Sequence, residues 1–188
     1  MPNTSIRTAE DARQVIQRRI DEDVDGRSDA YILYDNYQVK PLARAASDCF
    51  GTDSNGRPNR TQMRKLERVA LSASTYSEIL NYVKSQAGRD TRTGEEWRHR
   101  GFAYDLHNQL EDVRSEAEGR AEKILDGIER ALLKAYQQED ESKSDAQKRL
   151  SNWVRHEMRL RCVQRYVGHL AAEYAYFVSE AYADTPGA

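Results

Sequence analysis

Apolar side chains recur every three or four residues along most of the 188-residue chain, which is the spacing of one face of an α-helix. No segment alternates apolar and polar residues with the period of two that a half-buried strand shows. The longest apolar stripe runs from Leu106 to Ala135 in steps of four and three, close to a coiled-coil seam. None of the four prolines falls inside a long periodic run. The pattern therefore predicts an all-α fold.

Capping and breaker residues divide this pattern into about five helices. Thr8 is the expected N-cap of the first helix, Asn59–Gln62 forms a capping-box pattern before the third, and Gly88 ends the third. Thr93–Glu96 is expected to cap the fourth. The expected helices cover residues 8–21, 29–50 with an interruption at Pro41, 59–87, 93–136 and 145–183, with a loop at 51–58.

The last two expected helices are each about 40 residues long, which corresponds to about 60 Å. We expect these two long C-terminal helices to pair antiparallel around residues 138–144, as part of a helical bundle. A single helical domain over residues 1–188 is expected, with N-terminal helices and a loop in 1–58 and the main bundle in 59–188.

The composition indicates a small core beneath a heavily charged surface. Hydrophobic residues make up 38% of the chain against a usual value of about 45–50%, and charged residues 32% against about a quarter. No apolar run approaches the length of a membrane-spanning helix, and residues 1–7 lack the apolar stretch of a signal peptide. Because Cys49 and Cys162 form no disulfide framework, we expect a reduced, cytoplasmic protein that does not contact a membrane.

The net charge of −2 hides a segregation of charge along the chain. Residues 57–100 hold ten Arg and Lys against five acids, and residues 148–169 hold six against one, so each block carries +5. Residues 105–145 hold six basic residues against twelve acidic ones, a balance of −6. The 22 Arg against 7 Lys favour phosphate binding, because the guanidinium fork suits that group, although a GC-rich genome also raises arginine content.

Two arginine-rich helix surfaces are the candidate binding sites. Arg60, Arg64 and Arg68 recur every four residues, with Lys65 beside them, and Arg161 and Arg165 repeat this spacing near the C-terminus. Such ladders can follow a phosphate backbone without reading its base sequence. The alternative interpretation is a solvated face with local ion pairs such as Arg64 with Glu67.

Catalytic and metal-binding patterns are weak. Glu96 and His99 have the spacing found in di-iron bundles, but those bundles need a second such pair and further glutamates. Cys162 lies on the apolar side of its helix, as expected for a core cysteine. We find no glycine-rich phosphate loop and no nucleophile motif, so we expect no catalytic residue, no metal and no cofactor.

Three stretches together resemble one family, the small helical subunit of type III (Csm-type) CRISPR interference complexes. Residues 60–66, Arg-Thr-Gln-Met-Arg-Lys-Leu, are similar to that family's helix start, and residues 86–89, Gln-Ala-Gly-Arg, to its Ala-Gly-Arg element. Residues 161–177 resemble its closing helix, with Arg-Tyr followed by small and aromatic residues. The sequence departs from the family at Arg60, where the family has Thr, and in its long acidic fourth helix.

The resemblance implies a non-catalytic subunit that stacks head to tail along a guide RNA–target RNA duplex, together with other subunits of the complex. It places Arg64 and Lys65 at the nucleic acid, with Arg89 and Arg165 as companions. The alternative is a helical adaptor or scaffold that docks a protein partner through the stripe from Leu106 to Ala135. An enzyme with Glu96 and His99 at its site is the third and weakest hypothesis.

Overall fold

The computed structural model describes residues 8–26, 39–52, 59–138 and 140–183. Every element in these residues is a helix, so the predicted all-α class is confirmed. The described residues contain more helices than the five expected, because two of the long predicted helices are interrupted. The second predicted helix falls in part, and the loop at 53–58 wholly, outside the described residues.

The chain divides into two compact units, each built from two separate stretches of sequence. Unit 1 consists of Met1–Ser28 and Ser115–Arg161, and unit 2 consists of Asp29–Arg114 and Cys162–Ala188. Two helices pass from one unit to the other, namely α7 (Phe102–Asp126) and α9 (Lys143–Ala183). Each unit is therefore described by itself.

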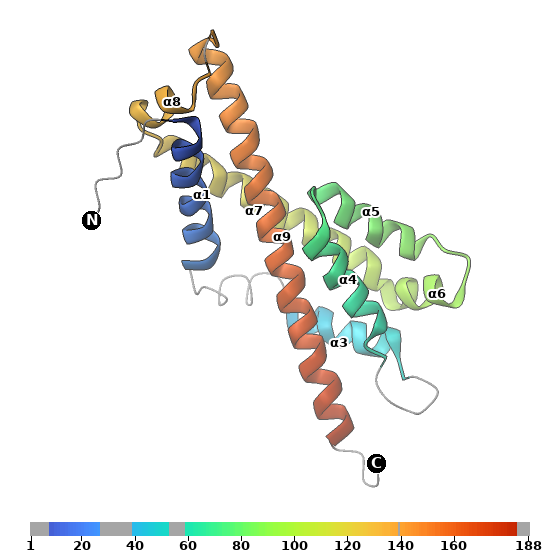
Figure 1. Ribbon diagram of the computed structural model, residues 1–188. Coiled ribbons are helices and arrows are strands. Elements are labelled where there is room, and N and C mark those ends of the chain that lie inside the picture. The colour runs from blue at the N-terminus through green and yellow to red at the C-terminus, as the bar shows by residue number, and fades with distance from the viewer. Residues whose placement is uncertain (1–7, 27–38, 53–58, 139, 184–188) are drawn as a thin grey trace. The chain divides into compact units, whose positions relative to one another are not determined.

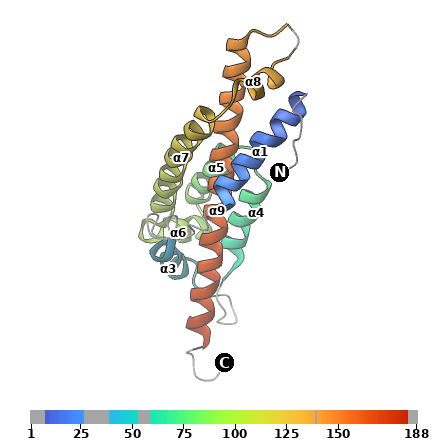
Figure 2. The same ribbon diagram turned by 90° about the vertical axis from the view of Figure 1, so that its left-hand side faces the viewer.

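In unit 1, α1 (Ala9–Gly26) packs against α8 (Arg130–Tyr136) and lies beside the first half of α9 (Figure 2). Thr8 caps α1 as predicted, because its hydroxyl accepts from the backbone N–H of Asp11 at 3.1 Å. The helix is longer than the expected 8–21. Val24, one turn beyond the buried Ile20, is only 8% exposed, so the apolar face continues beyond residue 21, where the helix was expected to end.

The loop between α8 and α9 is closed by Arg149. Its guanidinium donates to the carboxylate of Glu141 at 2.8 Å and to the backbone oxygen of Tyr136 at 3.0 Å. The same guanidinium lies 4.3 Å from the centre of the Tyr136 ring, which stacks on Trp153. The hydrogen bond from Arg149 lowers the pKa of Glu141 to about 2. One arginine thus holds the segment before α9 against α8.

We expect the Glu141 carboxylate to make unit 1 less stable in acid. Its pKa in the folded state lies below its value of about 4.5 in the unfolded chain, so its contribution is present above pH 4.5 and is lost as the pH falls towards 2. The free energy of unfolding, measured in urea, should therefore fall more steeply over this pH range for the wild type than for Glu141→Gln. Glu10→Gln, at an exposed position of α1, is the control. Equal pH profiles for the wild type and Glu141→Gln would contradict this assignment.

In unit 2, the helices surround a cluster of aromatic side chains. Trp97 is fully buried, and its ring centre lies 5.4 Å from that of Phe50, 5.6 Å from that of Phe102 and 6.0 Å from that of Tyr82. Tyr174 of α9 meets the edge of Phe50 at 6.1 Å. The cluster joins elements that lie far apart in sequence: α3 (Val39–Phe50), α5 (Tyr76–Ala87), α6 (Arg92–Arg98) and the two helices shared with unit 1.

The predicted helix 59–87 is interrupted, because residues 73–75 separate α4 (Thr61–Ser72) from α5. Thr75 and Glu78 form a capping box at the interruption: the Thr75 hydroxyl accepts from the Glu78 backbone at 3.3 Å, and Glu78 accepts from the Ser74 backbone at 3.0 Å. The expected capping role of Gln62 is wrong, because its side chain is buried and accepts from the Trp97 indole at 3.5 Å. The end of α5 at Ala87, before Gly88, is as predicted.

The predicted helix 93–136 is also interrupted. After α6, a short 3₁₀ turn, η1 (His99–Gly101), reverses the chain, with Arg100 at φ 50° and Gly101 at φ 77°. Gly101 is suited to this left-handed conformation, which most residues avoid. A second break at residues 127–129 separates α7 from α8. The first of the two expected forty-residue helices is therefore not continuous. The second corresponds to α9, which has 41 residues.

Gly94 marks a close approach of two backbone segments in unit 2. A Cβ atom at this position would lie 1.9 Å from the carbonyl oxygen and 2.8 Å from the carbonyl carbon of Arg89. Both of these atoms belong to the backbone, so they cannot move aside as a flexible side chain would. The turn that carries Trp97 into the core therefore requires glycine here.

We expect Gly94→Ala to destabilise the protein by at least about 2 kcal/mol, because it forces two backbone segments apart. Gly119→Ala is the matched control: Gly119 lies within α7, and no atom within 4 Å would meet the added Cβ. That change should be neutral or stabilise by up to about 1 kcal/mol. Denaturant titrations measure both, and equal effects of the two substitutions would show that the Arg89 contact does not constrain the fold.

Candidate nucleic-acid interface on α4

One face of α4 packs on the second half of α9, within unit 2 (Figure 1). Met63, Leu66 and Ala70 are buried on this face. Near its end, the α4 backbone oxygen of Ala70 accepts from the Gln164 side chain at 3.0 Å. Near its start, the Tyr174 hydroxyl donates to a backbone oxygen at 2.7 Å. These contacts fix which face of α4 meets solvent.

The hydroxyl of Tyr174 is a reliable donor in this position. It bonds the backbone oxygen of Asn59, the second residue before α4. Burial raises the pKa of Tyr174 to about 12, although the nearby charge of Arg60 opposes the shift. The hydroxyl therefore keeps its proton at neutral pH, and the start of α4 stays attached to α9.

Three cations project from the opposite face of α4. Arg64, Lys65 and Arg68 are all exposed, and their side chains form no ion pair or hydrogen bond with any other residue that the structure describes. The Arg64–Glu67 pair of the alternative interpretation is therefore absent among the described residues. Arg64 and Arg68 instead line, together with Glu67, Leu71 and Ser72, a shallow surface hollow of about 490 Å³. The face is accordingly available to an external anion.

Leu71 belongs to this surface and was not identified from the sequence. Its side chain is 70% exposed beside Arg68, at the end of the ladder. The sequence could have indicated its exposure, because Leu71 follows Ala70 and so lies away from the apolar face of the helix. A solvent-facing leucine next to unpaired cations adds an apolar contact to an otherwise charged surface.

Arg60 differs from the three cations that follow it. It is the N-cap residue of α4, is half-buried, and donates to the Ser179 hydroxyl of α9 at 2.8 Å. Its guanidinium is thus partly committed to holding α4 on α9. Of the predicted ladder of Arg60, Arg64 and Arg68, the structure brings Arg64 and Arg68 together on one open surface and uses Arg60 largely as a support.

Of the second predicted ladder, Arg161 and Arg165 on α9, Arg161 forms internal ion pairs within unit 1. Arg161 lies 3.2 Å from Asp21 and 3.3 Å from Glu157, so two acids already neutralise it. Two further pairs join α9 to α7. Arg159 lies 3.1 Å from Glu118, and one turn earlier on α9 and one turn later on α7, Arg155 lies 2.6 Å from Glu122. Binding of a phosphate backbone here would have to displace these acids.

The remaining predicted residues, Arg165 and Arg89, lie in unit 2. Arg165 is half-buried on the part of α9 that packs along α4, next to Gln164, and it lowers the pKa of His169 in addition to the effect of burial. Arg89 is exposed just beyond α5, and its backbone oxygen accepts from Arg98 at 3.0 Å. Neither residue lines the hollow formed by Arg64 and Arg68.

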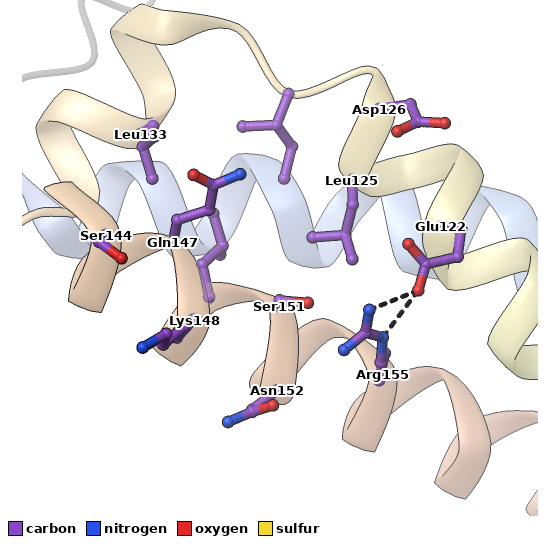
Figure 3. Close-up of a pocket in the computed structure, with 12 residues that line it drawn as sticks. Glu122, Leu125, Asp126, Leu133, Ser144, Gln147, Lys148, Ser151, Asn152 and Arg155 are labelled. Carbon is purple, nitrogen blue, oxygen red and sulfur yellow. Dashed lines mark hydrogen bonds and ion pairs between the residues drawn. The ribbon is translucent and has the colours of Figure 1, made fainter.

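A hollow of about 590 Å³ lies in unit 1 between the end of α7, α8 and the start of α9 (Figure 3). Leu125 and Leu133 point towards α9 in that view, and the ion pair of Glu122 with Arg155 lies at one end. Arg155 and Glu122 are ion-paired with each other, so neither side chain is available to bind a ligand in the hollow without breaking this pair. It is a gap between helices with one apolar wall.

The residues considered for chemistry have structural roles in the part of the chain that the structure describes. Glu96 pairs with Arg92 at 3.2 Å, and His99 is exposed. No group of three or more potential metal ligands occurs among the described residues. Cys162 is buried, as predicted for a core cysteine, and so is Cys49, where burial foremost raises the pKa of the thiol to about 11. A thiol with that pKa is a poor nucleophile at neutral pH.

Comparison with models of protein families, with curated proteins and with solved structures found no match to this chain. Among the described helices, none is both long enough and apolar enough to cross a lipid bilayer.

We expect the α9 arginines to act on stability and not on nucleic-acid affinity. Arg155→Gln and Arg159→Gln each remove an ion pair whose side chains are about one-third to one-half exposed, so each should cost about 0.2–1 kcal/mol. Affinity for a single-stranded RNA should stay within about twofold of the wild type. Denaturant titration and fluorescence anisotropy measure the two quantities. A large loss of RNA affinity in the double variant would show that the α9 ladder is released to bind.

Proposed function

We propose that this protein is a non-catalytic RNA-binding subunit of a type III CRISPR effector complex, and that α4 contacts the nucleic-acid backbone. The observation that carries the RNA-binding part is a contrast between two sets of cations. Arg64, Lys65 and Arg68 of α4 have no ion-pair partner among the described residues, whereas Arg159 and Arg161 of α9 are ion-paired. The assignment to a CRISPR complex depends on the sequence resemblance, which includes the same residues, 60–66.

The chemistry of α4 suits a phosphate backbone better than a specific base sequence. Guanidinium and ammonium groups on successive helical turns bind phosphate oxygens from one side, whatever base each nucleotide carries. Three such contacts to a single strand should give log K against log salt a slope of roughly −2. Three contacts are few, so the free protein should bind weakly, and stacking of several copies along one RNA would supply the avidity.

The proposed partners are a guide RNA–target RNA duplex or its target strand, the larger subunits of the complex, and further copies of this chain arranged head to tail. Charge segregation supports the last of these, because the acidic block 105–145 of one copy could meet a basic block of the next. No catalytic residue, cofactor or metal enters this proposal.

The adaptor hypothesis loses the feature on which it was based. Leu106, Leu110 and Val113 are each at most 2% exposed, and further along the stripe Ala117 and Ala121 are fully buried. The stripe from Leu106 to Ile124 is therefore part of the protein's own core, and this part offers a partner no apolar face, whereas Ile128 and Ala135 near its end are half-buried.

We expect Arg64→Glu/Arg68→Glu to weaken binding to single-stranded RNA by at least about tenfold at low salt and to reduce the magnitude of the salt slope. Both side chains are exposed, so circular dichroism and thermal unfolding should stay close to the wild type. Anisotropy titrations of a labelled RNA at several salt concentrations measure the affinity and the slope.

The matched control is Arg18→Glu/Arg130→Glu, which changes the net charge by the same amount at two exposed arginines of unit 1. Equal weakening by both double variants would show that only net charge matters and would overturn the assignment to α4. To test the wider proposal, the tagged protein is purified from its native cell with and without nuclease. Short RNAs with a shared repeat-derived end would support the CRISPR assignment, and their absence would contradict it.

A further inference from the structure

A second surface of unit 2 has the features of a protein-docking site and is unrelated to α4. It is an open groove of about 440 Å³ where the last turns of α5 meet the end of α6 and the first turns of α7, and we call it the α5–α7 groove. Its aliphatic part is formed by Val83 and Ala103, which are 1% and 7% exposed, together with the half-buried Ala87. The groove thus presents the edge of the hydrophobic core to solvent.

Tyr104 extends this apolar surface beyond the groove. It lines the groove and is 71% exposed, although tyrosine is among the residues with the largest apolar area. A single exposed aromatic residue is common on protein surfaces, but here it adjoins an apolar hollow, which makes the apolar surface continuous. Tyrosine, with tryptophan and arginine, is enriched among the residues that contribute most binding energy at protein interfaces.

Apart from Tyr104, the ionisable side chains that line the groove are all of the basic type. Lys84 is exposed, and Arg98 and His107 complete the set, whereas no carboxylate lines the groove. Arg98 is held in place because its guanidinium donates to the backbone oxygens of Ala87 and Arg89 at the end of α5. The nearest acid along the chain, Asp105, follows Tyr104 but does not line the groove. An occupant with negative charge therefore complements this surface.

We propose that the α5–α7 groove docks an acidic segment of a partner protein that carries an aromatic or aliphatic anchor. The volume lies near the lower end of the range for small-molecule pockets, about 300–1,000 Å³, so it admits one anchor side chain. A small ligand confined to the hollow would leave the ring of Tyr104 in water, whereas a peptide that continues past the anchor covers it. Acidic residues beside the anchor then meet Lys84 and Arg98.

RNA fits this groove less well than an acidic peptide does. Single-stranded nucleic acid binds through flat aromatic platforms and a row of cations. Here the hollow is lined by short aliphatic side chains, and Tyr104 is its single large aromatic residue. The aliphatic lining suits a side chain such as leucine or phenylalanine.

The test is selection from a random peptide library displayed on phage, with the full chain as bait, followed by anisotropy titration of the enriched peptides. Enriched peptides should contain an aromatic or aliphatic residue flanked by Asp or Glu. Lys84→Glu and Tyr104→Ala should each weaken binding of those peptides by at least about tenfold. Both positions are exposed, so neither substitution should unfold the protein.

Matched controls are Lys123→Glu and Tyr176→Ala, which change an exposed lysine and an exposed tyrosine elsewhere and should alter peptide affinity by less than about twofold. Enrichment of neutral or basic peptides, no enrichment, or full binding by Tyr104→Ala would overturn the proposal. Loss of RNA affinity in Tyr104→Ala and Lys84→Glu would assign the groove to RNA and would also overturn it. Failure of the α4 proposal leaves this result unchanged, because the two surfaces share no residue.

Discussion

The burial of Trp97 is the constraint on which unit 2 depends. Its ring is fully enclosed and lies against Phe50, Phe102 and Tyr82, and its indole N–H donates to Gln62 of α4. The turn that carries it inward tolerates only glycine at position 94. Because Gln62 and the adjacent Met63 face this core, the cations that follow them on α4 are turned towards solvent. The open face of α4 is thus a consequence of packing on the other side of the same helix.

Ion pairing separates two arginine ladders that look alike in the sequence. The α9 arginines find Asp21, Glu118 and Glu122 within unit 1, so their charges are balanced inside the protein. Arg64 and Arg68 find no such acid among the described residues, and their charge stays available. Arginine can therefore serve either an anion-binding site or a stabilising ion-pair network, and the presence of acidic neighbours distinguishes the two.

The small apolar fraction of the chain is compensated by polar anchors at the helix ends. Arg149 closes the loop before α9 through Glu141 and Tyr136, and in unit 2 the Tyr174 hydroxyl ties the start of α4 to α9. Such contacts make a small core sufficient to hold long helices in place. Some apolar surface is nevertheless uncovered at the α5–α7 groove, where Tyr104 is 71% exposed.

The sequence by itself determined the helical class, the cap at Thr8, the end of α5 before Gly88 and the burial of Cys162. These features depend on helical periodicity and capping, which involve only neighbours within a few residues. The break at Thr75 was also readable, since Thr75-Tyr-Ser-Glu78 is a capping box, but the apolar stripe continues across it and conceals it. Only the tertiary structure decided which arginines are paired, because Arg161 meets an acid 140 positions earlier in the chain. It also decided that Gln62 serves the core and not the helix cap, since Trp97 arrives from a different helix. Such long-range contacts follow from how the helices pack, which periodicity does not encode.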